Sequence, residues 1–273
     1  EAALTAPDAQ RYFKAYADAI AALGARGPWQ DVLDAPSISV KLSALHPRYE
    51  VAKRERVHVE LTPLVLQLAQ LAKQHGIGMT VDAEEADRLE LSLDVIGAVF
   101  AAKSLEGWNG FGLAVQAYQK RAPFVIDWLA DTARKANRRW CVRLVKGAYW
   151  DSEIKRAQEL GLSGYPVFTR KPNTDVSYLA CARKLLEAGA EWVYPQFATH
   201  NAHTIAAIHH LAGGRPFEFQ RLHGMGADLY AEVTGKDKWN VPCRVYAPVG
   251  SHEDLLPYLV RRLLENGANT SFV

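Results

Sequence analysis

Polar side chains stand at or near the ends of seven short segments that are otherwise largely apolar. They include cations, a carboxylate, amides, histidines and tyrosines, which can bind and orient an anionic or planar ligand. In chain order they are Lys41, Asp82, Gln116, Arg143, Lys146, Tyr149, Thr199, His200, Asn201, Gln220, His223 and Tyr246. One polar segment end is common in proteins, but seven that converge form a site. The elements that carry these residues therefore decide whether such chemistry is possible.

The seven segments have the length and the β-branched or aromatic content of strands. They span residues 37–43, 77–82, 111–116, 140–146, 192–197, 217–222 and 243–247. Between them apolar residues recur at helical spacing, which predicts helices. The clearest helical stripes lie in residues 12–23, 61–72 and 86–100, and further helices are expected near residues 122–136, 174–188, 201–211 and 251–266.

Alternating strands and helices indicate parallel strands joined by crossovers, in either an open sheet or a closed barrel. The G-x-G-x-x-G turn of dinucleotide-binding folds and the Walker phosphate loop are both missing from the sequence. An eight-stranded barrel needs roughly 250 residues. Because the chain opens with a helical pattern, we expect the first strand of such a barrel to lie before Glu1. No linker or shift in composition divides the chain, so we expect one domain over residues 1–273.

The composition excludes several classes of protein. The 273 residues include 32 Lys and Arg against 30 Asp and Glu, a formal net charge of +2, and 49% are apolar. These proportions exclude collagen, low-complexity disorder and a disulfide scaffold. Near-neutral charge with scattered basic residues gives no drive towards nucleic acid. The longest apolar run, residues 95–102, is too short to span a membrane, and the first residues lack the pattern of a secretory signal.

The sulfur and imidazole groups do not form a recognised metal or disulfide pattern. Cys141, Cys181 and Cys243 are too widely spaced for a zinc site and odd in number, so we interpret them as core residues of a cytoplasmic protein. His200 and His203 have a spacing loosely like that of metal ligands, but no third ligand accompanies them in a known arrangement. We therefore do not favour zinc.

Several polar positions also have a purely structural interpretation. Asp82 could cap the helix that follows it, and Gln116 could be a satisfied core amide. Arg143 differs, because it alternates with apolar neighbours and would place a charge inside a barrel, where it must be paired or bind a polar ligand. Tyr149 and Trp150 either form flat walls beside a planar ligand or pack beneath a turn.

The last predicted helix carries Arg261, Arg262 and Glu265 opposite its apolar face. Such residues usually form a solvated surface, where an ion pair contributes little. Over a barrel mouth, two adjacent arginines would instead clamp a carboxylate through bidentate hydrogen bonds. Sequence physics alone favours the solvated surface.

Eight segments together resemble one known family, in the same order and over nearly the whole chain. This family is the proline dehydrogenase domain of the bacterial bifunctional proline-utilisation (PutA-type) flavoenzymes. The segments are residues 42–49 (LSALHPRY), 81–85 (VDAEE), 116–121 (QAYQKR), 143–151 (RLVKGAYWD), 197–201 (FATHN), 222–226 (LHGMG), 246–250 (YAPVG) and 258–272 (YLVRRLLENGANTSF).

The resemblance implies a fold and an activity. The fold is a distorted (βα)8 barrel of the TIM type, with the final helix over the barrel mouth and non-covalently bound FAD. The activity is the oxidation of L-proline to Δ1-pyrroline-5-carboxylate by hydride transfer to flavin N5, with electrons passed to a membrane quinone. Full-length members also carry an aldehyde dehydrogenase domain and a DNA-binding part. A cytoplasmic location, peripheral at the inner membrane, is expected for the full-length protein.

The resemblance also assigns roles to residues of this chain. Lys41, Arg261 and Arg262 would bind the proline carboxylate. The catalytic positions would be Arg143, which hydrogen-bonds flavin N5, with Asp82 and Tyr246. Four residues would enclose the proline ring: Ala148, Tyr149, Leu222 and Tyr246. Glu1 would pair with Arg261 as a gate. The cofactor-lining positions would be Asp82, Gln116, Arg143, Val145, Lys146, Gly147, Ala148, Trp150, Thr169, Arg170, Lys171, Thr199, His200, Asn201, Gln220, Leu222 and Glu265.

Two other functions fit the same residues. A barrel aldolase or phosphate-binding lyase would use Lys41 or Lys146 as a Schiff-base amine. A catalytically inactive barrel would serve as a regulatory or docking part. The proline oxidoreductase is the leading hypothesis, because it accounts for the polar residues at all seven segment ends.

Overall fold

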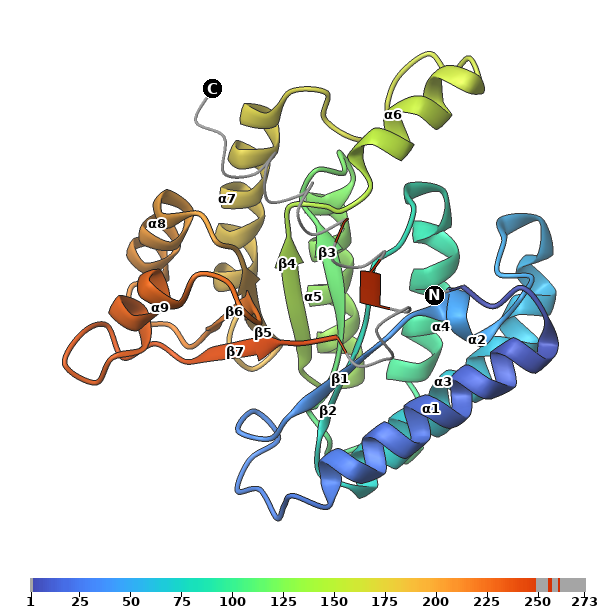
Figure 1. The fold of residues 1–273 in the computed structure, drawn as a ribbon, viewed down its shortest axis with the longest axis horizontal. Coiled ribbons are helices and arrows are strands. Elements are labelled where there is room, and N and C mark those ends of the chain that lie inside the picture. Colours follow the sequence, from blue (N-terminus) through green and yellow to red (C-terminus); the bar gives the residue numbers. More distant parts are fainter. Residues whose placement is uncertain (1, 249–254, 257–259, 261–273) are drawn as a thin grey trace. The chain divides into compact units, whose positions relative to one another are not determined.

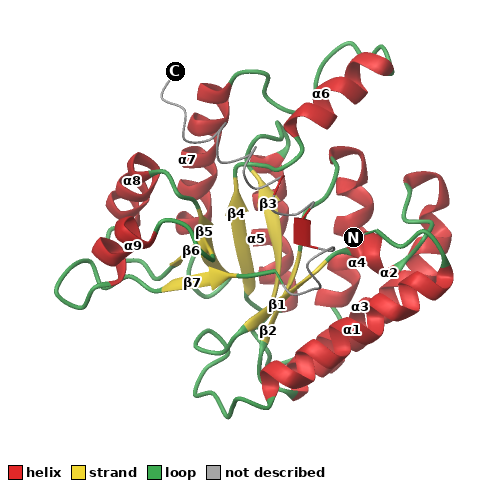
Figure 2. Ribbon diagram, in the orientation of Figure 1, coloured by secondary structure: helices red, strands yellow, loops and turns green. Residues whose placement is uncertain are grey.

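The computed structural model describes residues 2–248, 255–256 and 260. Strands and helices alternate along the chain (Figures 1 and 2). The strands are β1 (Ser37–Val40), β2 (Gly78–Val81), β3 (Phe111–Gln116), β4 (Trp140–Val145), β5 (Val193–Ala198), β6 (Glu218–Leu222) and β7 (Cys243–Tyr246). The helices are α1 (Ala6–Gly24), α2 (Leu42–Leu45), α3 (Arg54–Gln74), α4 (Leu89–Phe100), α5 (Ala122–Ala136), α6 (Trp150–Glu159), α7 (Lys171–Glu187), α8 (Ala202–Ala212) and α9 (Ala227–Thr234). Short 3-10 turns are η1 (Val51–Lys53), η2 (Ala86–Arg88) and η3 (Lys103–Leu105).

The strands follow one another in the sheet in chain order, from β1 to β7. The pairs β1–β2 and β2–β3 are parallel, and so are β5–β6 and β6–β7. Parallel neighbours in chain order require a crossover after each strand, and helices provide it. The predicted α/β fold class of the TIM-barrel type is therefore confirmed.

Two differences from the predicted elements have a local cause. The first strand ends at Val40 rather than at residue 43, because residues 42–45 turn into the short helix α2. Helix α6 is absent from the predicted helices, since only Glu153 and Ala157 are buried on it and no apolar stripe marks it. The predicted helix at residues 251–266 lies almost entirely outside the described residues.

The chain divides into two compact units, and each is described by itself. The first comprises residues 1–114 and 131–141. Helix α1 starts with a capping box between Thr5 and Asp8, and α3 packs against both α1 and α4 through its buried stripe of residues 57, 61, 65 and 68. The Phe100 ring stacks on that of Trp140 with a centroid distance of 3.6 Å. Helices α1 and α3 also contact β1 and β2, so these helices and strands enclose the apolar core of the first unit.

The second unit comprises residues 115–130 and 142–273. Helix α7 packs against β5 and against α8, and α9 contacts β7 (Figure 1). On the helix side of these strands, Phe197 and Phe219 are fully buried, together with Tyr178 of α7. Because side chains alternate along a strand, the neighbouring residues Gln196 and Gln220 point to the opposite face. That opposite face is polar, which is unusual for a buried sheet.

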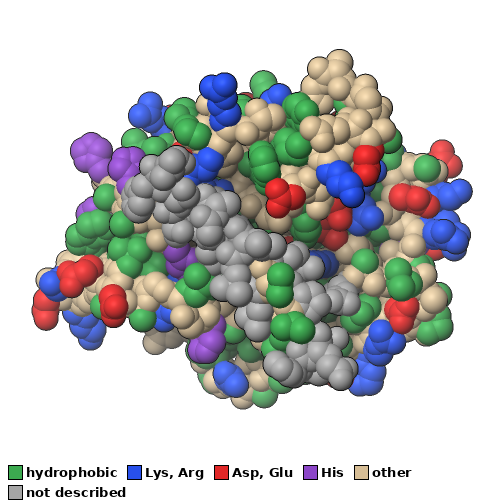
Figure 3. Space-filling view, turned by 45° about the horizontal axis from the view of Figure 1, so that its top comes forward, with side chains coloured by type: hydrophobic (Ala, Val, Ile, Leu, Met, Phe, Trp, Pro, Cys, Tyr) green, Lys and Arg blue, Asp and Glu red, His purple; other side chains and the backbone are tan. Residues whose placement is uncertain are grey.

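The distribution of surface charges and the burial of the cysteine thiols are those of a globular protein. On the face shown in Figure 3, Lys and Arg side chains are interspersed with Asp and Glu. No helix of the described residues has both the length and the apolar character needed to span a bilayer. Cys141 and Cys181 are buried as predicted, whereas Cys243 is only partly buried. Burial raises the pKa of Cys181 and of Cys243 to about 11.

Candidate active site

The first unit places Lys41 and Asp82 directly after two neighbouring parallel strands. The Asp82 backbone N–H donates to the Val40 carbonyl at 2.9 Å, which ties the end of β2 to β1. The Lys41 backbone N–H donates to the Tyr16 hydroxyl oxygen on α1 at 3.2 Å. Burial raises the pKa of Tyr16 to about 12, although this hydrogen bond acts in the opposite direction. A neutral hydroxyl therefore holds the backbone at Lys41.

A buried carboxyl group, Glu84, lies beside these strand ends. Its side chain is only 8% exposed, and Oε1 accepts a hydrogen bond from the Ser43 backbone N–H at 3.0 Å. Burial raises the pKa of Glu84, and this effect exceeds the opposing hydrogen bonds from Ser43 and the charge of Lys41. The Glu84 carboxyl group thus fastens the turn that follows β2 to the turn that follows β1.

The capping interpretation of Asp82 is wrong. The 3-10 turn η2 precedes α4, and the residues at the N-cap positions are Glu85 for η2 and Arg88 for α4. Neither side chain makes a capping hydrogen bond. Asp82 is separated from α4 by this extra turn, which the helical spacing of residues 86–100 did not reveal.

The second unit brings Arg143, Gln220 and Tyr246 together from β4, β6 and β7. Arg143 is 6% exposed. Its Nε donates to Gln220 Oε1 at 2.8 Å, and its Cζ lies 5.1 Å from the centre of the Tyr246 ring. A guanidinium over an aromatic ring gains a cation–π interaction. Arg143 is therefore buried and paired, which is one of the two expectations for a charge at this position, and its contact with a polar ligand stays a prediction.

Sequence analysis missed three residues around Gln220. Glu218, which is 3% exposed, accepts hydrogen bonds at Oε1 from Gln196 Nε2 at 3.0 Å and from Gln220 Nε2 at 2.8 Å. Arg244 pairs with both carboxylate oxygens, at 2.9 Å through Nε and 3.1 Å through Nη2. A signal was present, because Glu218 and Arg244 precede Gln220 and Tyr246 by two positions and so share their strand faces.

The Lys146 ammonium group at the end of β4 pairs with a further residue that sequence analysis missed, Asp175 of α7. The Lys146 Nζ–Asp175 Oδ1 distance is 2.5 Å, and Lys171 Nζ lies 2.8 Å from Oδ2. Burial alone raises the pKa of Asp175, but the hydrogen bonds and charges of Lys146 and Lys171 outweigh it, so this pKa lies below its usual range. Because one carboxylate serves two ammonium groups, positive charge is in excess here.

The backbone that follows β4 runs against the ring of Tyr118. Gly147 has a φ of 143°, and a Cβ atom at this position would lie 2.4 Å from Tyr118. Only glycine fits both the conformation and the space. The next residue, Ala148, donates its backbone N–H to Gln116 Oε1 at 3.4 Å. Gln116 therefore supports the turn that carries Gly147 and Ala148.

The aromatic residues of this turn are not core residues. Trp150 is 43% exposed, and its Nε1 donates to the Phe168 carbonyl at 2.9 Å. Tyr149 is partly exposed and precedes α6 as its N-cap residue. The interpretation that both pack beneath a turn is wrong.

Val145, the last residue of β4, accepts a hydrogen bond from the Ala117 backbone N–H at 2.8 Å.

The turn that follows β5 is fixed by hydrogen bonds from β6 and α9. The Tyr230 hydroxyl donates to the Thr199 carbonyl at 2.6 Å, and the Leu222 backbone N–H donates to His200 Nε2 at 3.1 Å. A nitrogen that accepts carries no proton, so a neutral His200 carries its proton on Nδ1. The Asn201 side chain caps α8. All three predicted positions therefore lie in one ordered turn.

The remaining predicted positions divide into two groups. Thr169, Arg170 and Lys171 stand at the start of α7, where Arg170 is the N-cap residue and makes no side-chain capping bond. Glu1, Arg261, Arg262 and Glu265 lie outside the described residues. The predicted carboxylate clamp and gate therefore stay predictions.

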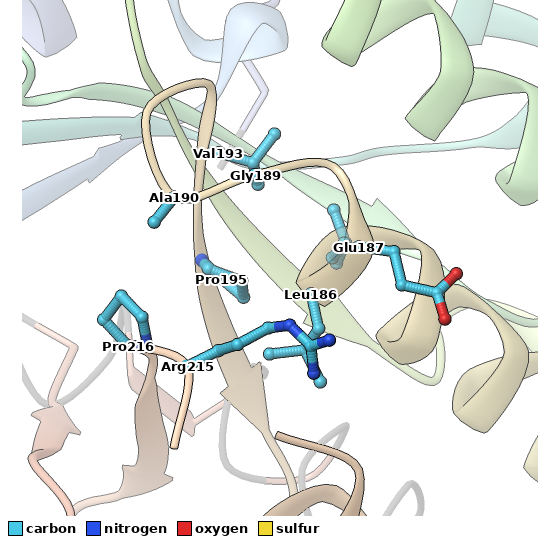
Figure 4. Close-up of a pocket in the computed structure, with 9 residues that line it drawn as sticks. Leu186, Glu187, Gly189, Ala190, Val193, Pro195, Arg215 and Pro216 are labelled. Carbon is cyan, nitrogen blue, oxygen red and sulfur yellow. The ribbon is translucent and has the colours of Figure 1, made fainter. Parts of the chain in front are cut away.

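A pocket of the second unit lies at the opposite ends of the strands. Its cavity volume is about 300 Å³, and it lies where β5 begins rather than where it ends. Figure 4 shows Val193 and Pro195 of β5 on one side and Arg215 with Pro216 on another. Pockets of this fold class that carry catalysis open at the carboxyl ends of strands. We therefore place the candidate active site at the strand ends and not in this pocket.

Comparisons with known proteins agree with the family resemblance. The sequence model of the family described as proline dehydrogenase matches residues 1–273. The bifunctional protein PutA of Salmonella typhimurium is 61% identical over 280 residues, covering 100% of this chain and 21% of that protein. The chain thus spans about a fifth of the length of the curated PutA relatives that it matches.

Solved structures show the same fold. A mutant of Bradyrhizobium japonicum PutA superposes with a TM-score of 0.95 and 63% identity, covering 100% of this chain and 28% of that one. PutA of Bdellovibrio bacteriovorus, inactivated by N-propargylglycine, superposes with a TM-score of 0.90 and 31% identity, covering 97% of this chain and 29% of that one. By sequence over its full extent and by fold, the chain belongs to the proline dehydrogenase family.

Proposed function

We propose that this chain is a single catalytic domain that oxidises L-proline to Δ1-pyrroline-5-carboxylate, with FAD as its bound cofactor and a membrane quinone as the final electron acceptor. Family membership supports the reaction class. The observation that carries the proposal for this chain is the buried Arg143, held at the strand ends by Gln220 and Tyr246. Such an arrangement serves a planar, polar ligand better than it serves the stability of a core.

The side chains at these strand ends fit FAD in their chemistry. Arg143 and Gln116 offer a donor and an amide for the polar edge of a flavin, and the Gly147 backbone, held against the Tyr118 ring, lies at the same strand end as Arg143. Lys146 and Lys171, which outnumber their shared Asp175, suit a pyrophosphate. Bound FAD would supply the hydride-accepting chemistry that no side chain provides.

The substrate roles follow the family motifs. Lys41, Arg261 and Arg262 bind the proline carboxylate, and Asp82 orients this group of side chains. The ring is enclosed by Ala148, Tyr149, Leu222 and Tyr246, while Glu1 pairs with Arg261 when the site closes. Holding proline at two ends restricts its orientation, which lowers the entropic part of the barrier. Beside bound FAD, the Arg143 guanidinium would stabilise negative charge on the flavin.

The alternative Schiff-base chemistry is less well supported. A Schiff base needs an uncharged amine. Lys146 is 5% exposed, and its Nζ already pairs with Asp175 Oδ1 at 2.5 Å. Trapping of a substrate adduct on Lys146 or Lys41 by borohydride would revive this alternative.

A visible spectrum tests the proposal directly. The purified, FAD-reconstituted chain is expected to show flavin absorption that bleaches anaerobically on addition of L-proline. N-propargylglycine, which inactivates the Bdellovibrio bacteriovorus relative, is expected to inactivate this chain in a time-dependent way. Flavin retention without bleaching would favour the docking function, and a chain that cannot take up flavin would refute the proposal.

The wider assignments also follow from the PutA relatives. We propose that the full-length protein carries an aldehyde dehydrogenase domain, since the chain covers 21% of the Salmonella typhimurium protein. In such a protein this domain would act on the cytoplasmic side of the inner membrane as a peripheral enzyme. Fractionation of cells that express the full-length protein, followed by proline:quinone reductase assays of each fraction, tests this placement.

A further inference from the structure

We propose that Glu218, paired with Arg244, is a positioning residue that fixes the Arg143 guanidinium through the side-chain amide of Gln220. The pairing itself is a property of the protein alone. Its consequence for the cofactor rests on the proposed function, because there Arg143 is the residue next to the flavin.

The Glu218 carboxylate is saturated with donors. Oε1 accepts from Gln196 Nε2, Gln220 Nε2 and Arg244 Nε, and Oε2 accepts from Arg244 Nη2, at distances from 2.8 to 3.1 Å. An ionised carboxylate can only accept, and it offers about four lone-pair sites. Because the guanidinium of Arg244 pairs side-on with both oxygens, Glu218 is kept in this acceptor-only form.

An acceptor-only neighbour determines which way the Gln220 amide points. Nε2 must face Glu218, so Oε1 faces Arg143 and accepts from its Nε at 2.8 Å. If the amide were reversed, Gln220 would present N–H groups to a guanidinium, which has no acceptor. The bond to Arg143 therefore depends on the charge of Glu218, which acts through the Gln220 amide.

Gln196 provides the matched comparison within the same cluster. It donates to the same Glu218 oxygen at 3.0 Å, from the neighbouring strand β5. Among the described atoms, its own Oε1 has no hydrogen-bond partner. Gln196 thus contributes to the burial and packing of the cluster without the link to Arg143 that Gln220 makes.

Stability alone does not account for the Glu218–Arg244 pair. A buried ion pair is often no more stabilising than apolar residues of the same volume, since both charges lose their hydration. These strands already have an apolar face against α7, with Phe197 and Phe219 fully buried. Orientation of the polar face is the property that an apolar replacement would not supply.

The test compares the reconstituted wild-type chain with three variants. Glu218→Gln/Arg244→Met removes both charges together, so that no unpaired charge is buried. Arg244→Lys keeps a cation beside Glu218 and hence keeps it acceptor-only. Gln196→Met removes a donor to Glu218 but leaves the Gln220 bond intact.

Two measurements are made on each variant. The first is the hydrogen-exchange rate of the Arg143 Nε–H by NMR in the flavin-free chain, its signal assigned by its loss in Arg143→Lys. The second is the midpoint potential of the FAD-loaded chain. The first needs no flavin, so it tests the positioning role even if the proposed function fails.

We expect exchange of the Arg143 Nε–H to accelerate by about tenfold or more in Glu218→Gln/Arg244→Met, because a hydrogen bond is lost. The midpoint potential should fall in the same variant, and both quantities should stay at wild-type values in Arg244→Lys and Gln196→Met. In an Arg143→Met background, the paired substitution should not shift the potential further.

Wild-type exchange in Glu218→Gln/Arg244→Met, or equal acceleration in Gln196→Met, would overturn the inference. Should the paired variant not fold, accelerated exchange in Arg244→Lys would overturn it and wild-type exchange there would support it. Failure of wild type to bleach with proline would count against the proposed function alone.

Discussion

The Cζ atom of Arg143 lies 5.1 Å from the centre of the Tyr246 ring. The two residues belong to β4 and β7, about a hundred positions apart in the sequence, and both are partly or fully withdrawn from solvent. An aromatic ring stabilises a cation without neutralising it. The guanidinium therefore keeps its charge while its orientation is fixed, which suits a group that must respond to charge on a ligand.

Replacing Arg143 with Met should reduce turnover of proline by about 10²–10³-fold, the usual effect of removing one donor that stabilises developing charge. The reason is that Met fills the volume but carries neither charge nor N–H groups. Steady-state kinetics with an artificial electron acceptor measures the effect. A loss confined to KM, with kcat unchanged, would show that Arg143 contributes to binding rather than to the transition state.

Gly147→Ala should destabilise the chain strongly. The substitution forces a side chain onto a residue with φ of 143° and within 2.4 Å of the Tyr118 ring. Strain and overpacking each cost about 1–3 kcal/mol, so the free energy of unfolding should fall by about 2–6 kcal/mol. Urea denaturation of the variant measures this loss.

Gly161→Ala is the matched control for this substitution. Gly161 also has a positive φ, of 61°, but among the described residues no atom beyond its chain neighbours lies within 4 Å of a Cβ there. Only the conformational cost of about 1–2 kcal/mol should appear. If both variants lose the same stability, contact with Tyr118 is not what requires glycine at position 147.

Glu84→Gln should change how stability depends on pH. Burial raises the pKa of Glu84 in the folded chain above the unfolded value of about 4.3. The stability that Glu84 contributes is thus complete below about pH 4.3 and is lost as the pH rises through the folded-state pKa. The free energy of unfolding of the variant, relative to wild type, should therefore rise between pH 4 and pH 8. A difference that does not vary with pH in urea titrations would contradict this.

Asp175→Asn should have the opposite dependence on pH. Hydrogen bonds from Lys146 and Lys171 hold the pKa of Asp175 below its usual range, despite the effect of burial. Its contribution to stability is present above the unfolded value of about 3.9 and is lost as the pH falls through the folded-state pKa. Wild type should therefore exceed the variant in stability at pH 6 and lose that advantage in acid.

Lys171→Met provides the graded control for this prediction. It removes one of the two cations, at 2.8 Å, and leaves Lys146 at 2.5 Å from the carboxylate. The stability that Lys171→Met loses as the pH falls should be intermediate between the losses of wild type and Asp175→Asn. Thermal unfolding followed by circular dichroism from pH 3 to pH 7 would separate the three chains.

Arg262→Met should weaken binding of proline by about 2–5 kcal/mol if the carboxylate clamp is desolvated, because the substrate carboxylate is left poorly paired. The measurement is the proline concentration that half-bleaches the flavin under anaerobic conditions. A change in proline binding below roughly 0.5 kcal/mol would support the interpretation of Arg262 as a residue of a solvated helix surface. The resemblance, rather than the described structure, motivates this prediction.

Local patterns predicted the strands well, because strand length and apolar content depend on nearby residues. The predicted strand at residues 111–116 coincides with β3, and Arg143 was correctly placed on the face opposite Val142 and Leu144. The exposed helix α6 escaped notice because its sequence carries no buried stripe. Helical spacing also did not separate η2 from α4.

The partners of the polar residues were harder to predict than the residues themselves. Asp175 reaches Lys146 from a helix that starts 25 positions later, and Glu218 acts from the strand that carries Gln220. Which distant carboxylate neutralises a given cation depends on strand register and helix placement, neither of which is encoded in local spacing. A charged residue two positions from a functional one on a buried strand is the signal to look for.

The thiol groups of Cys181 and Cys243, with pKa values of about 11, have a practical consequence. Thiolate is the nucleophile that reacts with peroxide, and at pH 8 only about one molecule in a thousand carries it at such a sulfur. Cys181 and Cys243 should therefore react slowly with peroxide, so prolonged turnover in air should leave both thiols unmodified.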